Sequence, residues 1–151
     1  MTKYNCFLLV DDDGDDVSIF KHVLRQVNPS IDLISAADGE EALNFLKHQQ
    51  SNLPDVIFLD LNMPRMSGKE CLIELKKDPD LQHIPVIMYT TSSQSKDIEE
   101  TMQKGAICFI TKPSDINELK NILHSIAQNV QGDLERCLRT LSNTSNTFIV
   151  C

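Results

Sequence analysis

The stretch Asp55-Val-Ile-Phe-Leu-Asp60-Leu-Asn-Met-Pro64 decides how the rest of the chain can be arranged. Its four consecutive apolar residues, 56–59, are typical of a parallel strand that is buried on both faces of a sheet. The run ends abruptly at Asp60, and Pro64 cannot continue a ladder of backbone hydrogen bonds. The stretch therefore predicts a central strand that carries Asp60 to its carboxyl end. An aspartate there is usually only a turn former, so any function must rest on further residues.

Short apolar segments and segments of helical periodicity alternate on both sides of this stretch. The expected strands are residues 4–10, 31–36, 56–59, 84–90 and 107–111. The expected helices are residues 17–27, a segment capped by Asp38, residues 68–77, a polar segment capped by Ser93 or Ser95 and ending at Gly105, and residues 113–130. This alternation predicts a doubly wound α/β fold in which five helices cover a five-stranded parallel sheet.

Composition narrows the class of protein. A chain of 151 residues with 41% hydrophobic side chains has the size of one domain with a real core. The net charge of −8 argues against binding to nucleic acid or to an anionic membrane. We expect neither a signal peptide nor a membrane-spanning segment. The five cysteines include no Cys-x-x-Cys pair, which suits reduced thiols in the cytoplasm.

Polar side chains follow four of the expected strands. Open parallel sheets place their chemistry in the crevice at the carboxyl ends of the strands. The residues at these ends are Asp11, Asp12 and Asp13, then Asp60 and Asn62, then Thr90, Thr91 and Ser92, and finally Lys112. Carboxylates that repel one another, together with a hydroxyl and an ammonium group, suit Mg²⁺ and a phosphoryl group. The sequence therefore predicts a Mg²⁺-dependent phosphoryl site.

Each of these residues also has an ordinary interpretation. Thr90 is a plausible strand terminus, Lys112 a plausible surface cation, and acids at 15 and 16 suit the first turn of a helix. A calcium-binding EF-hand does not fit the acidic run, because the glycine and the closing glutamate are missing from the required positions. The joint order of the set at successive strand ends favours a common site.

Taken together, these motifs resemble a bacterial response-regulator receiver domain. The resemblance rests on Leu9-Val10-Asp11-Asp12, on the stretch from Asp60 to Pro64 with Gly68, on Thr90 and on Lys112-Pro113, and it covers roughly residues 3–128. Residues 89–92 and 110–113 further resemble stand-alone receivers that partner phytochrome-type sensor histidine kinases. The resemblance implies a flavodoxin-like fold with strand order 2-1-3-4-5.

The resemblance also implies a role for each site residue. Asp60 would be the phospho-acceptor, and Lys112 would pair with phosphoryl oxygens. Asp12, Asp60 and the backbone carbonyl of Asn62 would bind Mg²⁺ directly, and Asp11 would act through a metal-bound water. Thr90 would be the switch hydroxyl. Phe109 would be the switch aromatic, where the family commonly has a tyrosine.

The expected function is that of a cytoplasmic switch in a two-component phosphorelay. Its partners would be a sensor histidine kinase or histidine phosphotransfer protein and a downstream protein target, and it would not be an enzyme in the ordinary sense. Two alternatives remain open at this point. One is a receiver-like module that binds partners without phosphorylation. The other is a Mg²⁺-dependent phosphatase, which lacks the second aspartate expected two residues after Asp60.

The segment after the receiver is the hardest to interpret. We expect a receiver domain at residues 1–130 and an extension at residues 131–151. Leu134, Leu138 and Leu141 indicate a short helix, and the polar residues 142–147 suggest a flexible end. Docking on the domain, a dimer interface and disorder all remain open for this tail. The apolar stripe of the last core helix continues toward Leu134, so a homodimer through this region is a further hypothesis.

Overall fold

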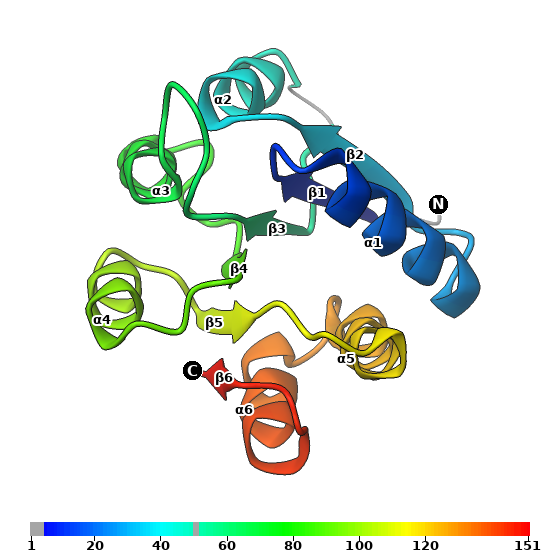
Figure 1. The fold of residues 1–151 in the computed structure, drawn as a ribbon. Helices are drawn as coiled ribbons and strands as arrows, with labels where there is room; N and C mark the ends of the chain where they lie inside the picture. Colours follow the sequence, from blue (N-terminus) through cyan, green and yellow to red (C-terminus); the bar gives the residue numbers. More distant parts are fainter. Residues whose placement is uncertain (1–4, 50–51) are drawn as a thin grey trace.

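The computed structural model describes residues 5–49 and 52–151, and within them an α/β sandwich (Figure 1). The strand expected from residue 4 begins at residue 6 in the described part, and residues 50 and 51 of the loop before the central strand lie outside it. The strands are β1 (Cys6–Val10), β2 (Asp32–Ala36), β3 (Val56–Leu59), β4 (Val86–Thr90), β5 (Cys108–Thr111) and β6 (Ile149–Val150). The helices are α1 (Gly14–Val27), α2 (Gly39–Lys47), α3 (Gly68–Lys77), α4 (Ser95–Gln103), α5 (Ile116–Asn129) and α6 (Leu134–Thr144).

The six strands form one sheet in the order β2-β1-β3-β4-β5-β6. The first five are parallel and confirm the expected order 2-1-3-4-5, whereas β6 is antiparallel to β5. The doubly wound α/β class is therefore confirmed, but the sheet has six strands rather than the expected five, because β6 follows the helix α6 that the leucines of the extension indicated. The additional strand is only two residues long and lies at the edge of the sheet, so its own sequence carries little periodic signal.

Helices cover both faces of the sheet. Figure 1 shows α1, α5 and α6 on one side and α2, α3 and α4 on the other. Because side chains alternate along a strand, each strand contributes to both resulting cores. Phe7 and Leu9 of β1 join the core beneath α1, α5 and α6, where Phe20, Phe58 and Tyr89 also pack. The neighbouring positions of β1, Leu8 and Val10, join the core beneath α2, α3 and α4.

Helix caps bring acidic groups to the carboxyl edge of the sheet. The side chain of Asp13 caps α1 by accepting hydrogen bonds from the backbone N–H groups of Asp15 and Asp16, and Asp38 caps α2 in the same way. The expectation that Ser93 or Ser95 caps α4 was wrong. Gln94 occupies the N-cap position without a side-chain hydrogen bond, and Ser95 is the first residue of the helix.

The extension packs against the end of the sheet. Leu134, Leu138 and Leu141 of α6 are buried in the same core as α5, as their helical spacing predicted. In β6, Ile149 is opposite Ile110 and Val150 is opposite Phe109. The backbone N–H of Thr111 donates to the carbonyl of Phe148 at 3.0 Å. The edge of β5 that a five-stranded sheet would leave open is therefore paired. Among the described residues, no helix is long and apolar enough to cross a membrane.

Candidate phosphoryl site

Three aspartates meet at the carboxyl ends of β1 and β3. Asp11 follows β1 directly and donates its backbone N–H to the carbonyl of Ala36, while Asp60 donates its own to the carbonyl of Val10. These two bonds continue the ladder one residue past each strand and fix both side chains at the same edge. Carboxylate oxygens of Asp11, Asp12 and Asp60 lie within 4.8 Å of one another. Asp11 and Asp60 are buried and Asp12 is exposed, so the cluster opens to solvent on one side.

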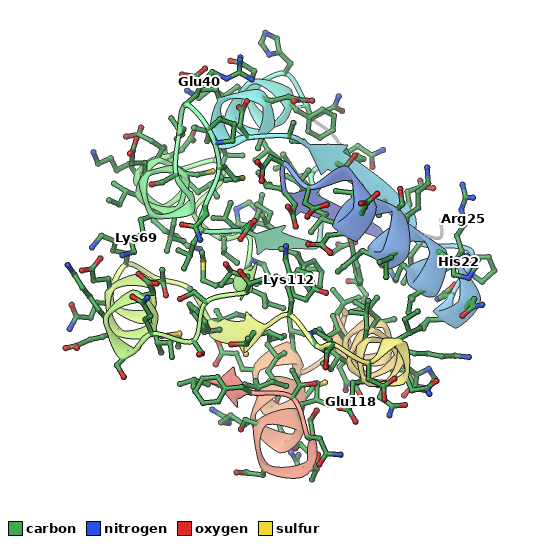
Figure 2. All side chains as sticks on the ribbon, in the orientation of Figure 1. His22, Arg25, Glu40, Lys69, Lys112 and Glu118 are labelled. Carbon is green, nitrogen blue, oxygen red and sulfur yellow. The ribbon has the colours of Figure 1, made fainter. Side chains whose placement is uncertain are left out.

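The ammonium group of Lys112 lies against this cluster. Its Nζ is 2.7 Å from Asp11 Oδ2, 2.7 Å from Asp16 Oδ2 and 3.8 Å from Asp60 Oδ2. The backbone N–H of Lys112 donates to the carbonyl of Thr90 at 2.7 Å, which holds the residue just beyond β5. In Figure 2 the labelled side chain lies near the centre of the molecule, beside the ends of the central strands. One cation thus faces three carboxylates, and with Asp12 in the same cluster the site has an excess of negative charge.

Burial, hydrogen bonds and neighbouring charges shift the pKa values of Asp11 and Lys112. The pKa of Asp11 is raised, chiefly because burial disfavours its charged form, although the hydrogen bond from Lys112 acts in the opposite direction. Burial alone would lower the pKa of Lys112. Hydrogen bonds to Asp11 and Asp16, together with the charge of Asp60, outweigh burial and leave the pKa of Lys112 raised. Lys112 is therefore a fixed positive charge at neutral pH.

Asp16 was not predicted to belong to the site. Asp16 was expected only to favour the first turn of α1, where acids are generally stabilising. The structure directs its carboxylate to Lys112, because Asp13 caps the helix and places Asp16 within the first turn at the same edge of the sheet. The available signal was its place in the first turn of the helix after β1, because that helix begins beside the expected site.

The two predicted switch residues occupy neighbouring strands. Thr90 ends β4 and is fully buried, and its Oγ1 atom has no hydrogen-bond partner among the residues that the structure describes. A buried hydroxyl without a partner is energetically unfavourable in a native core. Phe109 in β5 is also fully buried, in the core beneath α2, α3 and α4. In this structure the ring of Phe109 is therefore buried, and the hydroxyl of Thr90 has no hydrogen-bond partner among the described residues.

The loop after β3 returns sharply toward the sheet. Asn62 lies in this loop and its side chain is exposed. The backbone N–H of Gly68 donates to the carbonyl of Leu61 at 2.9 Å, which closes the loop at the start of α3. Within the loop, Arg65 has a φ of 63° and forms an ion pair with the buried Asp38. The backbone around Asn62 is thereby held between β3 and α3.

A second polar group connects the loop after β4 to its neighbours. Ser92 Oγ donates to Asp97 Oδ2 at 2.7 Å, and the hydroxyl of Thr111 donates to the carbonyl of Ser92 at 2.9 Å. The Nζ atom of Lys69 in α3 lies 2.8 Å from Asp97 Oδ1 and 2.7 Å from Glu100 Oε2, and both acids belong to α4. The segment that follows Thr90 is therefore attached to α3, α4 and β5.

Comparison with known proteins agrees with this geometry. Residues 7–124 match the family described as the response regulator receiver domain. The chain is 35% identical over 123 residues to response regulator Rcp1 of Synechocystis sp., an alignment that covers 79% of this chain and 84% of that protein.

Two solved structures are similar over most of their length. The phosphorylated cyanobacterial phytochrome response regulator RcpA superposes with a TM-score of 0.76 and 31% identity, covering 83% of this chain and 93% of that one. The Mn²⁺-bound form of Rcp1 superposes with a TM-score of 0.73 and 34% identity, covering 82% and 92%. The predicted resemblance to phytochrome-associated receivers is confirmed, and the chain belongs to the response-regulator receiver family, whose members are generally signalling proteins and not classical enzymes.

Proposed function

We propose that Asp60 accepts a phosphoryl group and that the modified chain presents an altered protein-binding surface. The observation that carries this proposal is the position of Asp60 in its cluster. Its Oδ1 atom accepts a hydrogen bond from the backbone N–H of Leu61 at 2.8 Å, while its Oδ2 atom faces Lys112. One oxygen is thus held in place, and the other is directed toward the cation that would stabilise an incoming phosphoryl group.

The residues present fit a divalent cation. The donor set consists of carboxylate oxygens, which Mg²⁺ prefers, and the surplus of acids over lysine leaves negative charge to be neutralised. Asp12, Asp60 and the backbone carbonyl of Asn62 would hold Mg²⁺ directly, with Asp11 acting through a bound water. When bound, Mg²⁺ would supply positive charge that offsets the repulsion between the aspartates and a phosphoryl group.

The chain's own residues account for the remaining requirements of the transfer. Oδ2 of Asp60 would form the new bond to phosphorus while the bond to the donor's leaving group breaks, as from a phosphohistidine or a small acyl phosphate. Lys112 would exchange part of its contact with Asp11 and Asp16 for the phosphoryl oxygens. Because little covalent chemistry is needed from the protein, positioning and charge neutralisation dominate such a transfer.

Thr90 and Phe109 would convert the new charge into a change of shape. A phosphoryl group carries close to two negative charges near neutral pH and offers strong acceptor oxygens. The unsatisfied hydroxyl of Thr90 would gain such an acceptor by moving toward Asp60. The neighbouring ring of Phe109 would then repack and alter the surface formed by α4, β5 and α5, in which β6 is paired with the edge of β5. Phe109 has no hydroxyl, so packing alone would hold its two positions.

The donor would be a sensor histidine kinase or a histidine phosphotransfer protein, and the output a downstream protein. The similarity to the phytochrome response regulator RcpA supports a phytochrome-type kinase as the donor. The net charge of −8 supports a protein partner over nucleic acid or a membrane, and a cytoplasmic location is part of the same proposal. The division into a receiver at residues 1–130 and an extension at residues 131–151, and a homodimer through that extension, are parts of the same proposal.

Intact-mass measurement tests the proposal directly. The native chain is incubated with acetyl phosphate and Mg²⁺, beside Asp60→Asn and the matched control Asp80→Asn, which alters an exposed loop aspartate far along the sequence from the cluster. We expect one labile, Mg²⁺-dependent adduct on the native chain and the control, and none on Asp60→Asn.

Two outcomes would favour the alternatives. If no adduct forms on the folded native chain, a constitutive binding module replaces the phosphorylated switch. If the native chain turns over phosphomonoesters and Asp60→Asn does not, the phosphatase alternative gains support. Equal labelling of native chain and Asp60→Asn would move the acceptor to another residue.

A further inference from the structure

Two thiols face each other across the pairing of β5 and β6. The Sγ atoms of Cys108 and Cys151 are 2.9 Å apart, although the residues are 43 positions apart in the sequence. Continuing the register of Phe109 with Val150 and Ile110 with Ile149 places Cys108 directly opposite Cys151. The contact therefore follows from the backbone pairing as well as from the side-chain rotamers.

The position of Cys108 and Cys151 in the antiparallel ladder is compatible with a disulfide bond. Thr111 donates its N–H to Phe148, so these two residues form a hydrogen-bonded pair of the antiparallel ladder. Because hydrogen-bonded and non-hydrogen-bonded pairs alternate, Cys108 and Cys151 form a non-hydrogen-bonded pair. The Cα atoms of such a pair are about 4.5 Å apart, a separation that lies within the range found for disulfides.

We propose that Cys108 and Cys151 are a redox modification site, at which a peroxide forms a reversible disulfide that fixes β6 to β5. This site is separate from the acidic cluster and adds a covalent modification to the receiver. The other three cysteines of the sequence, Cys6, Cys71 and Cys137, have no thiol partner at comparable distance among the described residues. In a reducing compartment a disulfide is typically transient and regulatory.

The two thiols differ in a way that orders the reaction. Cys151 is exposed and Cys108 is completely buried, so an oxidant reaches Cys151 first. The contact with the Cys108 thiol lowers the pKa of Cys151, an effect that the charge of Arg139 reinforces. The same contact, together with burial, raises the pKa of Cys108. A thiolate is the nucleophilic form of cysteine, so Cys151 is the attacking group.

The balanced chemistry needs one peroxide and no other reactant. The Cys151 thiolate attacks one oxygen of hydrogen peroxide, the O–O bond breaks, and the products are a sulfenic acid and hydroxide. Cys108 then attacks the sulfenic sulfur, its thiol proton passes to the leaving oxygen, and water departs. Two thiols and one peroxide thus give one disulfide and two waters. Reduction by glutathione reverses the change through thiol–disulfide exchange.

Oxidation would add a covalent bond to the non-covalent contacts that hold β6 against β5, and this bond would last until it is reduced. In the reduced chain β6 is held by its pairing with β5 and by the burial of Ile149. The segment before it is held by the hydroxyls of Ser145 and Thr147, which both donate to Glu118 of α5. Since Phe109 is paired with Val150, a fixed β6 would also restrain the strand that carries the proposed switch aromatic. That last consequence rests on the proposed function, whereas the disulfide does not.

The test is disulfide mapping of the whole chain after titration with hydrogen peroxide. Non-reducing digestion and mass spectrometry should recover one linked pair of peptides, containing Cys108 and Cys151, which glutathione separates. Cys151→Ser, an exposed substitution, should lose the linkage. Cys137→Ser is the matched control, because it removes the half-buried thiol of the neighbouring helix and should leave the linkage intact.

Hydrogen exchange supplies a second readout that does not involve mutation. The amide of Thr111, which bonds to Phe148, should exchange roughly ten- to a hundredfold more slowly in the oxidised chain, because the disulfide limits the separation of β6 from β5. A dominant Cys137–Cys151 or intermolecular linkage, or equal exchange in the two states, would overturn the proposal. Asp60→Asn should form the same disulfide, so failure of phosphorylation and failure of this site are distinguishable.

Discussion

Replacing Gly68 by alanine should displace the backbone that carries Asp60. A Cβ atom at this position would lie 2.8 Å from the Cα of Leu61 and 2.9 Å from the carbonyl carbon of Asp60, and the carbonyl oxygen of Asp60 would be closer still. These are backbone atoms, which cannot rotate away as the end of a flexible side chain can. Either α3 or the end of β3 must move, so we expect a loss of about 1–3 kcal/mol in the free energy of unfolding.

The same displacement should reduce acceptance of a phosphoryl group. A misplacement of about 1 Å near reacting atoms can lower a rate on the order of a hundredfold. Urea unfolding measures the first effect, and the rate of adduct formation with acetyl phosphate and Mg²⁺ measures the second. Gly14→Ala is the matched control for stability, because Gly14 also begins a helix but its added Cβ would meet nothing within 4 Å. If Gly68→Ala behaves like the control in both assays, the argument from backbone contact is refuted.

Three further changes test other parts of the structure. Thr90→Val removes a buried hydroxyl that lacks a partner in the described part of the chain, so urea unfolding should show unchanged stability or a gain of up to about 1 kcal/mol; a clear loss would mean that the hydroxyl is satisfied. Glu118→Ala removes the acceptor of the Thr147 hydroxyl and should cost about 1–3 kcal/mol, with faster amide exchange in β6; unchanged exchange would show that Glu118 does not restrain the strand. Hydrogen bonds from Lys69 and Ser92 lower the pKa of Asp97 from its ordinary value of 3.8, so its contribution to stability is present above that pH and is lost as the pH falls through the folded-state pKa. Asp97→Asn should therefore flatten the acid limb of the stability profile, and an unchanged limb would contradict this assignment.

The sequence predicted the central fold because the first five strands are short, mostly apolar segments placed between periodic helices. The helix α6 was also expected, since Leu134, Leu138 and Leu141 recur at helical spacing. The strand β6 was not expected, because a two-residue strand depends on the partner edge that it meets. Ile149 and Val150 become a strand only because β5 offers an unpaired edge to an adjacent segment.

Prediction of the site was most successful where a residue directly follows a strand. Asp11, Asp60 and Lys112 meet as expected, because parallel strands deliver their following residues to one edge. Asp16 was missed because its position depends on the cap of α1. Three consecutive aspartates precede that helix, and pattern alone did not establish that Asp13 would cap it. The contact between Cys108 and Cys151 was missed for the same reason as β6, since it exists only through that pairing.

The proposed switch and the extension are connected by consecutive hydrogen bonds. Thr90 lies two residues before Ser92, whose carbonyl accepts the hydroxyl of Thr111 at 2.9 Å. Thr111 in turn donates its backbone N–H to Phe148 immediately before β6. If a movement of Thr90 toward Asp60 displaces the backbone of Ser92, the bond between Ser92 and Thr111 must lengthen or the end of β5 must shift. Because β6 is paired with that end, the position of the extension would depend on which of the two occurs.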